Sequence, residues 1–152
     1  MKYETTRFGS IEVQDSDIIH FSDGLYGFER ELKFVLLPLD PDIESPMEWL
    51  QSLTTSRLAF IVTDPFLFVQ DYNLVLSDDE KDRLKIESQE SVLVRVIVTV
   101  PEVHTDMTAN LIAPLVINQE HQLAKQVVLT SAEYDTRHYL MRHEDRKPQQ
   151  QT

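Results

Sequence analysis

Apolar and polar residues alternate with a period of two along most of this chain, which is the pattern of half-buried β-strands. The clearest case is the run 92–100, where every second residue is valine and the positions between them include Leu93 and Ile97. Apolar residues on both faces predict a central strand that is covered on both sides. The run 107–117 alternates almost as strictly, and Pro114 within it indicates a sheet edge or a bulge.

Shorter alternating runs predict further strands, separated by turns that contain glycine, proline, aspartate and serine. These runs cover residues 2–7, 11–14, 18–21, 34–39, 48–53, 58–62, 72–76 and 121–129. The first two should form a hairpin that turns at Gly9 and Ser10. Gly24 and Gly27 are expected to supply positive φ angles in the loop after the third run.

One helix is clearly indicated near residues 78–85. Ser77 and Glu80 have the spacing of a capping box, in which each side chain accepts a hydrogen bond from the backbone of the other residue. Asp78 and Asp79 add negative charge to the first turn, where the helix dipole favours it.

Strand follows strand with short links, so the sequence predicts an all-β fold, mostly an antiparallel meander, with one short helix. Eight to ten strands in one domain usually curl or close to limit free edges, which predicts a barrel or pseudo-barrel. Residues 1–140 are expected to form a single domain, and residues 141–152, rich in glutamine, a flexible C-terminal tail.

The composition narrows the possible compartments and cofactors. The chain has no cysteine, which rules out disulfides, thiolate metal sites and a cysteine nucleophile. No apolar leader follows Met1, and apolar runs such as 58–62 are far too short to span a bilayer. We therefore expect a cytoplasmic protein that does not bind membranes.

Acidic residues dominate the charge, and they are unevenly spread. The formal net charge is −12. Residues 12–48 contain ten acids and two bases, and residues 64–90 contain eight acids and three bases. Such a surface repels nucleic acid and attracts basic partners, so we expect no direct nucleic-acid binding. An alternative interpretation is that the charge serves solubility.

No catalytic constellation stands out in the sequence, and no metal or cofactor is expected. A Gly-rich phosphate loop, an HExxH motif and a GxSxG motif are all missing, and the histidines have unrelated spacings. Twenty-six acids nevertheless make close carboxylate pairs possible. The alternative to a binding protein is therefore a carboxylate-based hydrolase with its site at the barrel mouth.

Several stretches of the chain occur in a recognisable order. They are Ile18-Ile19-His20-Phe21-Ser22-Asp23-Gly24-Leu25-Tyr26-Gly27-Phe28-Glu29, Phe34 to Leu39, Trp49 to Ser52, Leu58 to Phe66, Val98 to Pro101 and Met107 to Asn118. Together these stretches resemble the FliW family of bacterial flagellar assembly factors. Their order and spacing cover about residues 1–138. Ser22 departs from the family, which more often has proline at that turn.

The resemblance implies a function that composition does not show. FliW proteins bind newly made flagellin in the cytoplasm and also bind CsrA, an RNA-binding dimer that represses translation of flagellin messenger RNA. Export of flagellin frees FliW, which then captures CsrA and relieves the repression. The resemblance thus implies a regulatory partner switch without catalysis, carried out by a protein that we expect to be a monomer.

Six residues are candidates for partner contacts. Tyr26 lies in a glycine-containing loop, and Phe66, Phe68 and Tyr72 follow Asp64-Pro65 in a second loop. Exposed aromatic residues in loops are typical interface anchors, although Phe66 and Phe68 could instead plug one end of the barrel. Two further candidates, Asn110 and Asn118, share the polar face of an apolar strand; they either contact a partner's backbone or face solvent.

Overall fold

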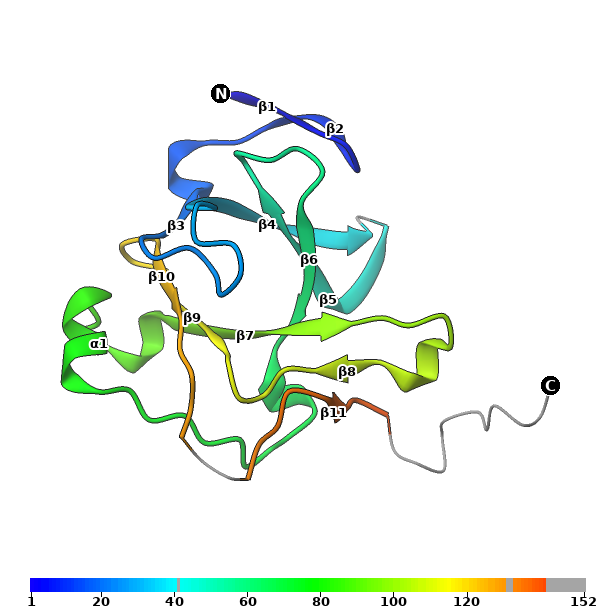
Figure 1. The fold of residues 1–152 in the computed structure, drawn as a ribbon. Helices are drawn as coiled ribbons and strands as arrows, with labels where there is room; N and C mark the ends of the chain where they lie inside the picture. Colours follow the sequence, from blue (N-terminus) through cyan, green and yellow to red (C-terminus); the bar gives the residue numbers. More distant parts are fainter. Residues whose placement is uncertain (41, 131–132, 142–152) are drawn as a thin grey trace.

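Seven strands close into a barrel in the computed structural model, which describes residues 1–40, 42–130 and 133–141 (Figure 1). The order around the ring is β7-β6-β5-β4-β3-β10-β9, and β9 pairs with β7 to close it. Neighbouring strands in this ring are antiparallel except for one pair, β3 and β10, which is parallel. The strands are β3 (Ile19–Phe21), β4 (Lys33–Asp40), β5 (Ile43–Ser52), β6 (Ala59–Thr63), β7 (Val92–Thr99), β9 (Leu115–Asn118) and β10 (Leu123–Gln126).

The remaining elements lie around this barrel. The hairpin of β1 (Lys2–Thr5) and β2 (Gly9–Glu12) forms a separate sheet, and β8 (Thr108–Ala109) pairs with β7 and with β11 (His138–Tyr139). The helical elements are short. They are η1 (Asp15–Asp17), η2 (Pro65–Leu67), α1 (Asp78–Arg83), η3 (Gln89–Ser91) and η4 (His104–Asp106).

Strand alternation divides the apolar residues between the barrel interior and its outer surface. The interior cluster includes Phe34, Leu50, Val62 and Leu115, all with 0% exposure, and Phe21 meets Phe34 edge-on at 5.3 Å between ring centroids. The residues between them on each strand point outward. Burial of this cluster supplies the main driving force for closing the barrel.

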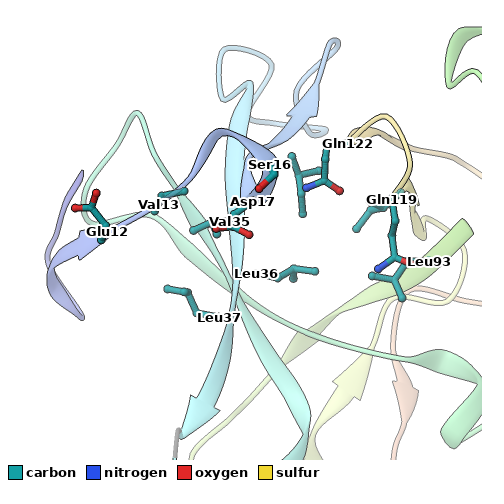
Figure 2. A pocket seen from close by; sticks show the side chains of 12 residues that line it. Glu12, Val13, Ser16, Asp17, Val35, Leu36, Leu37, Leu93, Gln119 and Gln122 are labelled. Atoms are coloured by element: carbon teal, nitrogen blue, oxygen red, sulfur yellow. The ribbon is translucent and has the colours of Figure 1, made fainter. Parts of the chain in front are cut away.

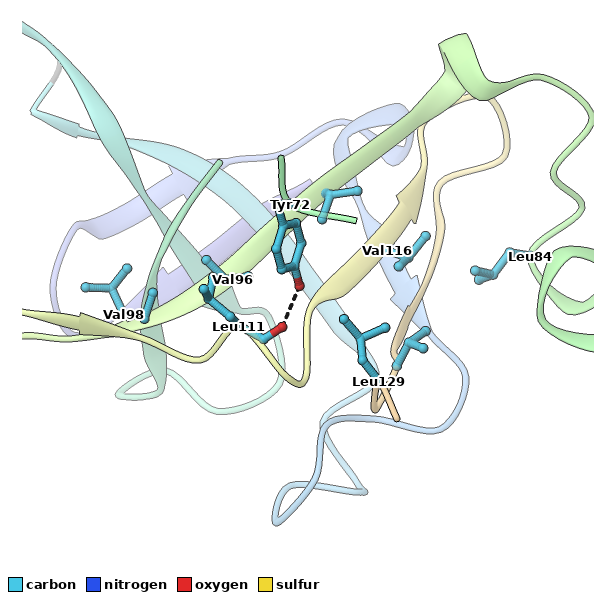
Figure 3. Packing of buried hydrophobic residues seen from close by; sticks show 10 residues of the cluster. Tyr72, Leu84, Val96, Val98, Leu111, Val116 and Leu129 are labelled. Atoms are coloured by element: carbon cyan, nitrogen blue, oxygen red, sulfur yellow. Dashed lines mark hydrogen bonds between the residues drawn. The ribbon is translucent and has the colours of Figure 1, made fainter. Parts of the chain in front are cut away.

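Two segments cover the outward-facing apolar residues of the barrel. The N-terminal hairpin region packs Val13 and Ile18 against Val35 of β4. The chain around η2 and α1, together with the chain after β10, covers the outer face of β7 and β9 in a second cluster (Figure 3). Tyr72 belongs to this second cluster, and its hydroxyl donates a hydrogen bond of 2.5 Å to the carbonyl oxygen of Leu111.

The structure confirms the all-β barrel, the N-terminal hairpin and the short helix. Ser77 and Glu80 form the expected capping box, with Glu80 N–H donating to Ser77 Oγ at 3.1 Å. The run 92–100 gives β7, which is covered on both faces as expected. Gly24 has a φ of +65°, and a Cβ there would lie 2.6 Å from the carbonyl oxygen of Phe28, so this position requires glycine.

Three local predictions are wrong. Residues 72–76 form no strand, because that stretch crosses the outer cluster without a neighbouring strand. The run 107–117 is split into β8 and β9 by residues 110–114, where Asn110 and Pro114 turn the chain. The hairpin turns at residues 6–8 and Gly9 already begins β2.

The tail expected at residues 141–152 lies outside the described residues, apart from Met141. Within the described ranges, no helix is long and apolar enough to cross a membrane.

Candidate interaction surface

The mouth of the barrel at the β4–β5 end is hollow and acidic. A hollow of about 670 Å³ is lined by five carboxylates and one guanidinium, a net formal charge of −4. These residues, the acidic mouth, are Asp40, Asp42, Glu44, Glu48, Asp64 and Arg95. Apolar side chains share the lining, among them Leu36 and the exposed Leu67.

Strand alternation explains why charge collects at this place. Glu48 is on the same face of β5 as the interior residue Leu50, and Arg95 is on the same face of β7 as Leu93. Both side chains therefore reach the end of the interior, where Arg95 Nε donates to Glu48 Oε1 at 2.7 Å. Arg95 also donates to the carbonyl oxygen of Val94 at 2.9 Å, so the guanidinium is held in place.

Two more carboxylates of the acidic mouth hold the local backbone. Asp40 Oδ1 accepts the N–H of Asp42 at 2.9 Å, and Asp64 Oδ1 accepts the N–H of Phe66 and so caps η2. These bonds hold the two carboxylates in position. The acidic mouth is thus a rigid negative surface with apolar side chains beside it, which suits a basic protein partner.

A second hollow, of about 490 Å³, lies between the N-terminal hairpin region, β4 and the turn from β9 to β10 (Figure 2). Val35, Leu36 and Leu37 form much of its wall. Its two carboxylates bind within the hairpin region: Glu12 pairs with the terminal amine at 3.1 Å, and Asp17 accepts the N–H of Gln14 at 3.3 Å. Both acids therefore have structural partners.

The hydrolase alternative requires two carboxylates that face a common substrate position. At the acidic mouth Glu48 is paired with Arg95, while Asp40 and Asp64 accept backbone N–H groups. In the part of the chain that the structure describes, no three His, Asp or Glu side chains converge to hold a metal ion. Three of the five carboxylates of the acidic mouth are therefore engaged with partners inside the protein.

Two of the predicted contact residues, Tyr26 and Phe66, are exposed, and they lie at separate places. Tyr26 is 61% exposed in the loop after β3, where its N–H donates to Gln126 Oε1 at 2.9 Å. Phe66 is 43% exposed and rests edge-on against Tyr72, while Phe68 is half-buried. The chain turns at the 3₁₀ helix η2 between these two phenylalanines. Their side chains therefore lie in different environments, whereas in an extended strand both would point to the same side.

Tyr72 and Asn118 are buried, and neither offers a side chain to a partner on this surface. Tyr72 is 4% exposed within the outer cluster. Asn118 is 0% exposed because the end of α1 covers it, so the expectation of a solvent-facing or partner-facing side chain is wrong. Asn110 is half-buried, and its Oδ1 accepts the N–H of Ala113 at 3.2 Å in the loop between β8 and β9.

Sequence reasoning missed several exposed apolar residues. Leu67 at the acidic mouth is 60% exposed, and Val75 and Val128 are 75% and 52% exposed. The sequence pattern placed Val75 and Val128 in predicted strands. Whether such a side chain is covered depends on contacts between distant segments, which the pattern does not show. The high acid content of residues 12–48 was the one available indication of the acidic mouth.

The fold and this surface define a small closed β-barrel protein with an acidic mouth. A family model described as "FliW protein" matches residues 2–140. The chain is 42% identical to the flagellar assembly factor FliW of Alkaliphilus metalliredigens over 152 residues, covering 100% of this chain and 93% of the relative. It is also 42% identical to the flagellar assembly factor FliW of Ruminiclostridium cellulolyticum over 141 residues, covering 93% and 95%.

A solved structure agrees with the sequence relatives. The crystal structure of a flagellar assembly factor FliW superposes with a TM-score of 0.87 at 40% identity, covering 95% of this chain and 99% of that one. This chain therefore belongs to the FliW family. Its relatives are named as assembly factors rather than as enzymes.

Proposed function

We propose that this protein is a cytoplasmic flagellar assembly factor that binds flagellin and the translational repressor CsrA and has no catalytic role. While flagellin occupies the protein, CsrA remains active. Export of flagellin frees the protein, which then captures CsrA and relieves repression of flagellin synthesis. The observation that carries the proposal is the acidic mouth in a member of the FliW family.

Electrostatics supports CsrA as the partner at the acidic mouth. A protein that binds RNA presents basic surface to the phosphates, and an acidic surface attracts it and raises the rate of encounter. Asp42 and Glu44 are exposed and add to the field of the mouth, while Leu67 offers an apolar contact. An acidic protein held beside an RNA site would also weaken RNA binding by repulsion.

A double charge reversal at the acidic mouth tests this proposal. Asp42→Lys with Glu44→Lys should slow association with CsrA by roughly tenfold, because the local field that steers encounter is reversed. Dissociation should change less. Stopped-flow mixing at two salt concentrations measures both rates, and the loss should shrink at the higher salt because ions screen exposed charges.

The matched control reverses two exposed acids near η3, Glu87→Lys with Glu90→Lys. Each double variant changes the formal net charge from −12 to −8, since every reversal adds two charges. Equal slowing in both variants would show that overall charge, and not the acidic mouth, governs the encounter.

A further inference from the structure

A third hollow, a groove away from the acidic mouth, lies between the chain that precedes α1 and the chain that follows β10. Figure 1 shows these segments in green and orange on the side of the molecule that carries α1. The groove has a volume of about 460 Å³. One wall includes Asn73, Val75 and Leu76, and the other includes Val128 and Tyr134.

The first wall is an extended segment outside any sheet, and its backbone forms a free edge. From Asn73 to Ser77 exposed and half-buried residues alternate, as they do along an extended chain. Among the residues that the structure describes, the backbone groups of Leu74, Val75 and Leu76 have no hydrogen-bond partner. Such N–H and C=O groups are a template for one more strand.

Both ends of this edge are fixed. The N–H of Asn73 donates to the hydroxyl of Tyr134 at 2.6 Å, and the Tyr134 ring packs against Tyr72 at an interplanar angle of 52°, with 4.7 Å between ring centroids. The N–H of Ser77 donates to Glu80 Oε1 at 2.9 Å in the capping box. The edge between these anchors is therefore held open in a defined position.

The groove also exposes apolar surface on both walls. Val75 is 75% exposed and Val128 is 52% exposed. The backbone of residues 127–129 pairs on its other side, where Val127 N–H donates to Pro114 and Leu129 N–H donates to Ile112. The side chains of an added strand alternate between pockets and solvent. Those that face the groove would contact Val75 and Val128, which lie beside the free backbone edge.

The charge around the groove indicates which kind of protein segment fits there. The charged residues that line the groove are two acids, Glu80 and Glu133, and its lining includes no lysine or arginine. A second copy of this chain would bring an equally acidic edge against the first, and like charges facing each other are unfavourable. A strand with basic residues beside its apolar ones has complementary charge.

We propose that this groove, separate from the acidic mouth, binds an extended segment of another protein by strand addition to Leu74–Leu76. The segment carries alternating apolar side chains, which contact Val75 and Val128, and basic residues at its ends. Backbone hydrogen bonds supply the alignment and the apolar contacts supply specificity. The site is independent of the partner at the acidic mouth.

The probe is a blocked seven-residue peptide of alternating valine and threonine with a lysine at each end. Titration into the isotopically labelled protein, followed by amide shifts in NMR, should move the signals of residues 73–77 and 127–130. The same peptide with alternate amides N-methylated cannot donate to the edge and should bind at least tenfold more weakly. A peptide with glutamate at each end should also bind more weakly.

Variants locate the site. Val75→Asp should weaken binding of the lysine peptide at least tenfold, whereas Val75→Thr should retain most of it because threonine is also β-branched. Val100→Asp, which introduces the same charge at an exposed valine that lines neither the groove nor the acidic mouth, is the matched control and should bind like the unchanged protein. Each variant's amide spectrum shows whether it is folded.

Three results would overturn the proposal. The first is equal binding of the N-methylated peptide, which would mean that the backbone edge is not used. The second is peptide-induced shifts confined to residues away from both walls. The third is concentration-dependent self-association that moves the same amides without peptide, which would make a second copy the occupant.

Discussion

Replacing Tyr72 with alanine is expected to lower the free energy of unfolding by about 3 to 5 kcal/mol, the range for truncation of a buried aromatic side chain. The ring lies within the outer cluster (Figure 3). It also contacts Phe66 and Tyr134. For a domain of this size the melting temperature should fall by about 6 °C or more. Chemical denaturation gives the free energy directly.

Tyr72→Phe separates the hydroxyl from the ring. It should cost about 1 to 3 kcal/mol, because the buried carbonyl of Leu111 loses its donor. Tyr26→Ala is the control for an exposed tyrosine and should change the free energy by less than about 0.5 kcal/mol. A Tyr72→Ala variant as stable as Tyr26→Ala would contradict the packing described for the outer cluster.

The Tyr72 hydroxyl also gives a pH dependence. Burial raises the pKa of Tyr72 above its ordinary value of 10.0, and the nearby Tyr134 adds to the shift. The unfolded chain therefore loses this proton first as the pH rises. The contribution of the protonated Tyr72 hydroxyl to stability is fully present below pH 10.0 and is lost as the pH rises above that value. Tyr72→Phe should show a smaller loss of stability than the unchanged protein over that alkaline range.

Asn118→Ala should destabilise the protein by about 3 kcal/mol, from three hydrogen bonds worth about 1 kcal/mol each. The side-chain amide donates to the carbonyl oxygens of Leu84 and Lys85 at 2.8 and 3.0 Å, and its oxygen accepts the N–H of Glu120 at 3.0 Å. It therefore ties the end of α1 to β9 in the wall of the barrel.

Asn110→Ala is the matched control for Asn118→Ala. Asn110 is half-buried and holds Ala113 at 3.2 Å, so its replacement should cost about 1 kcal/mol or less. Denaturant unfolding of the two variants compares them directly. Equal losses would mean that the amide of Asn118 does not join α1 to the barrel.

The difference between these two asparagines shows what the sequence could not reveal. Both alternate with apolar neighbours, so the local pattern gave them the same polar face. Asn118 is buried because residues 84 and 85, more than thirty positions away, end α1 over it. Contacts of this kind depend on closure of the barrel, which no local period encodes.

Local patterns were sufficient where local physics decides the structure. The capping box at Ser77 and the two-sided strand β7 depend on nearby residues and on strand alternation, and both were predicted. The stretch 72–76 has the alternation of a strand but no neighbouring strand, and the sequence could not show that. The pairing of Glu48 with Arg95 likewise joins strands 47 positions apart.

Calorimetric titration of the purified protein with flagellin and, separately, with CsrA tests the proposed function most directly. The proposal predicts saturable heat with each partner at one main site, and no heat with RNA alone. Absence of heat with both proteins at high micromolar concentration would contradict it.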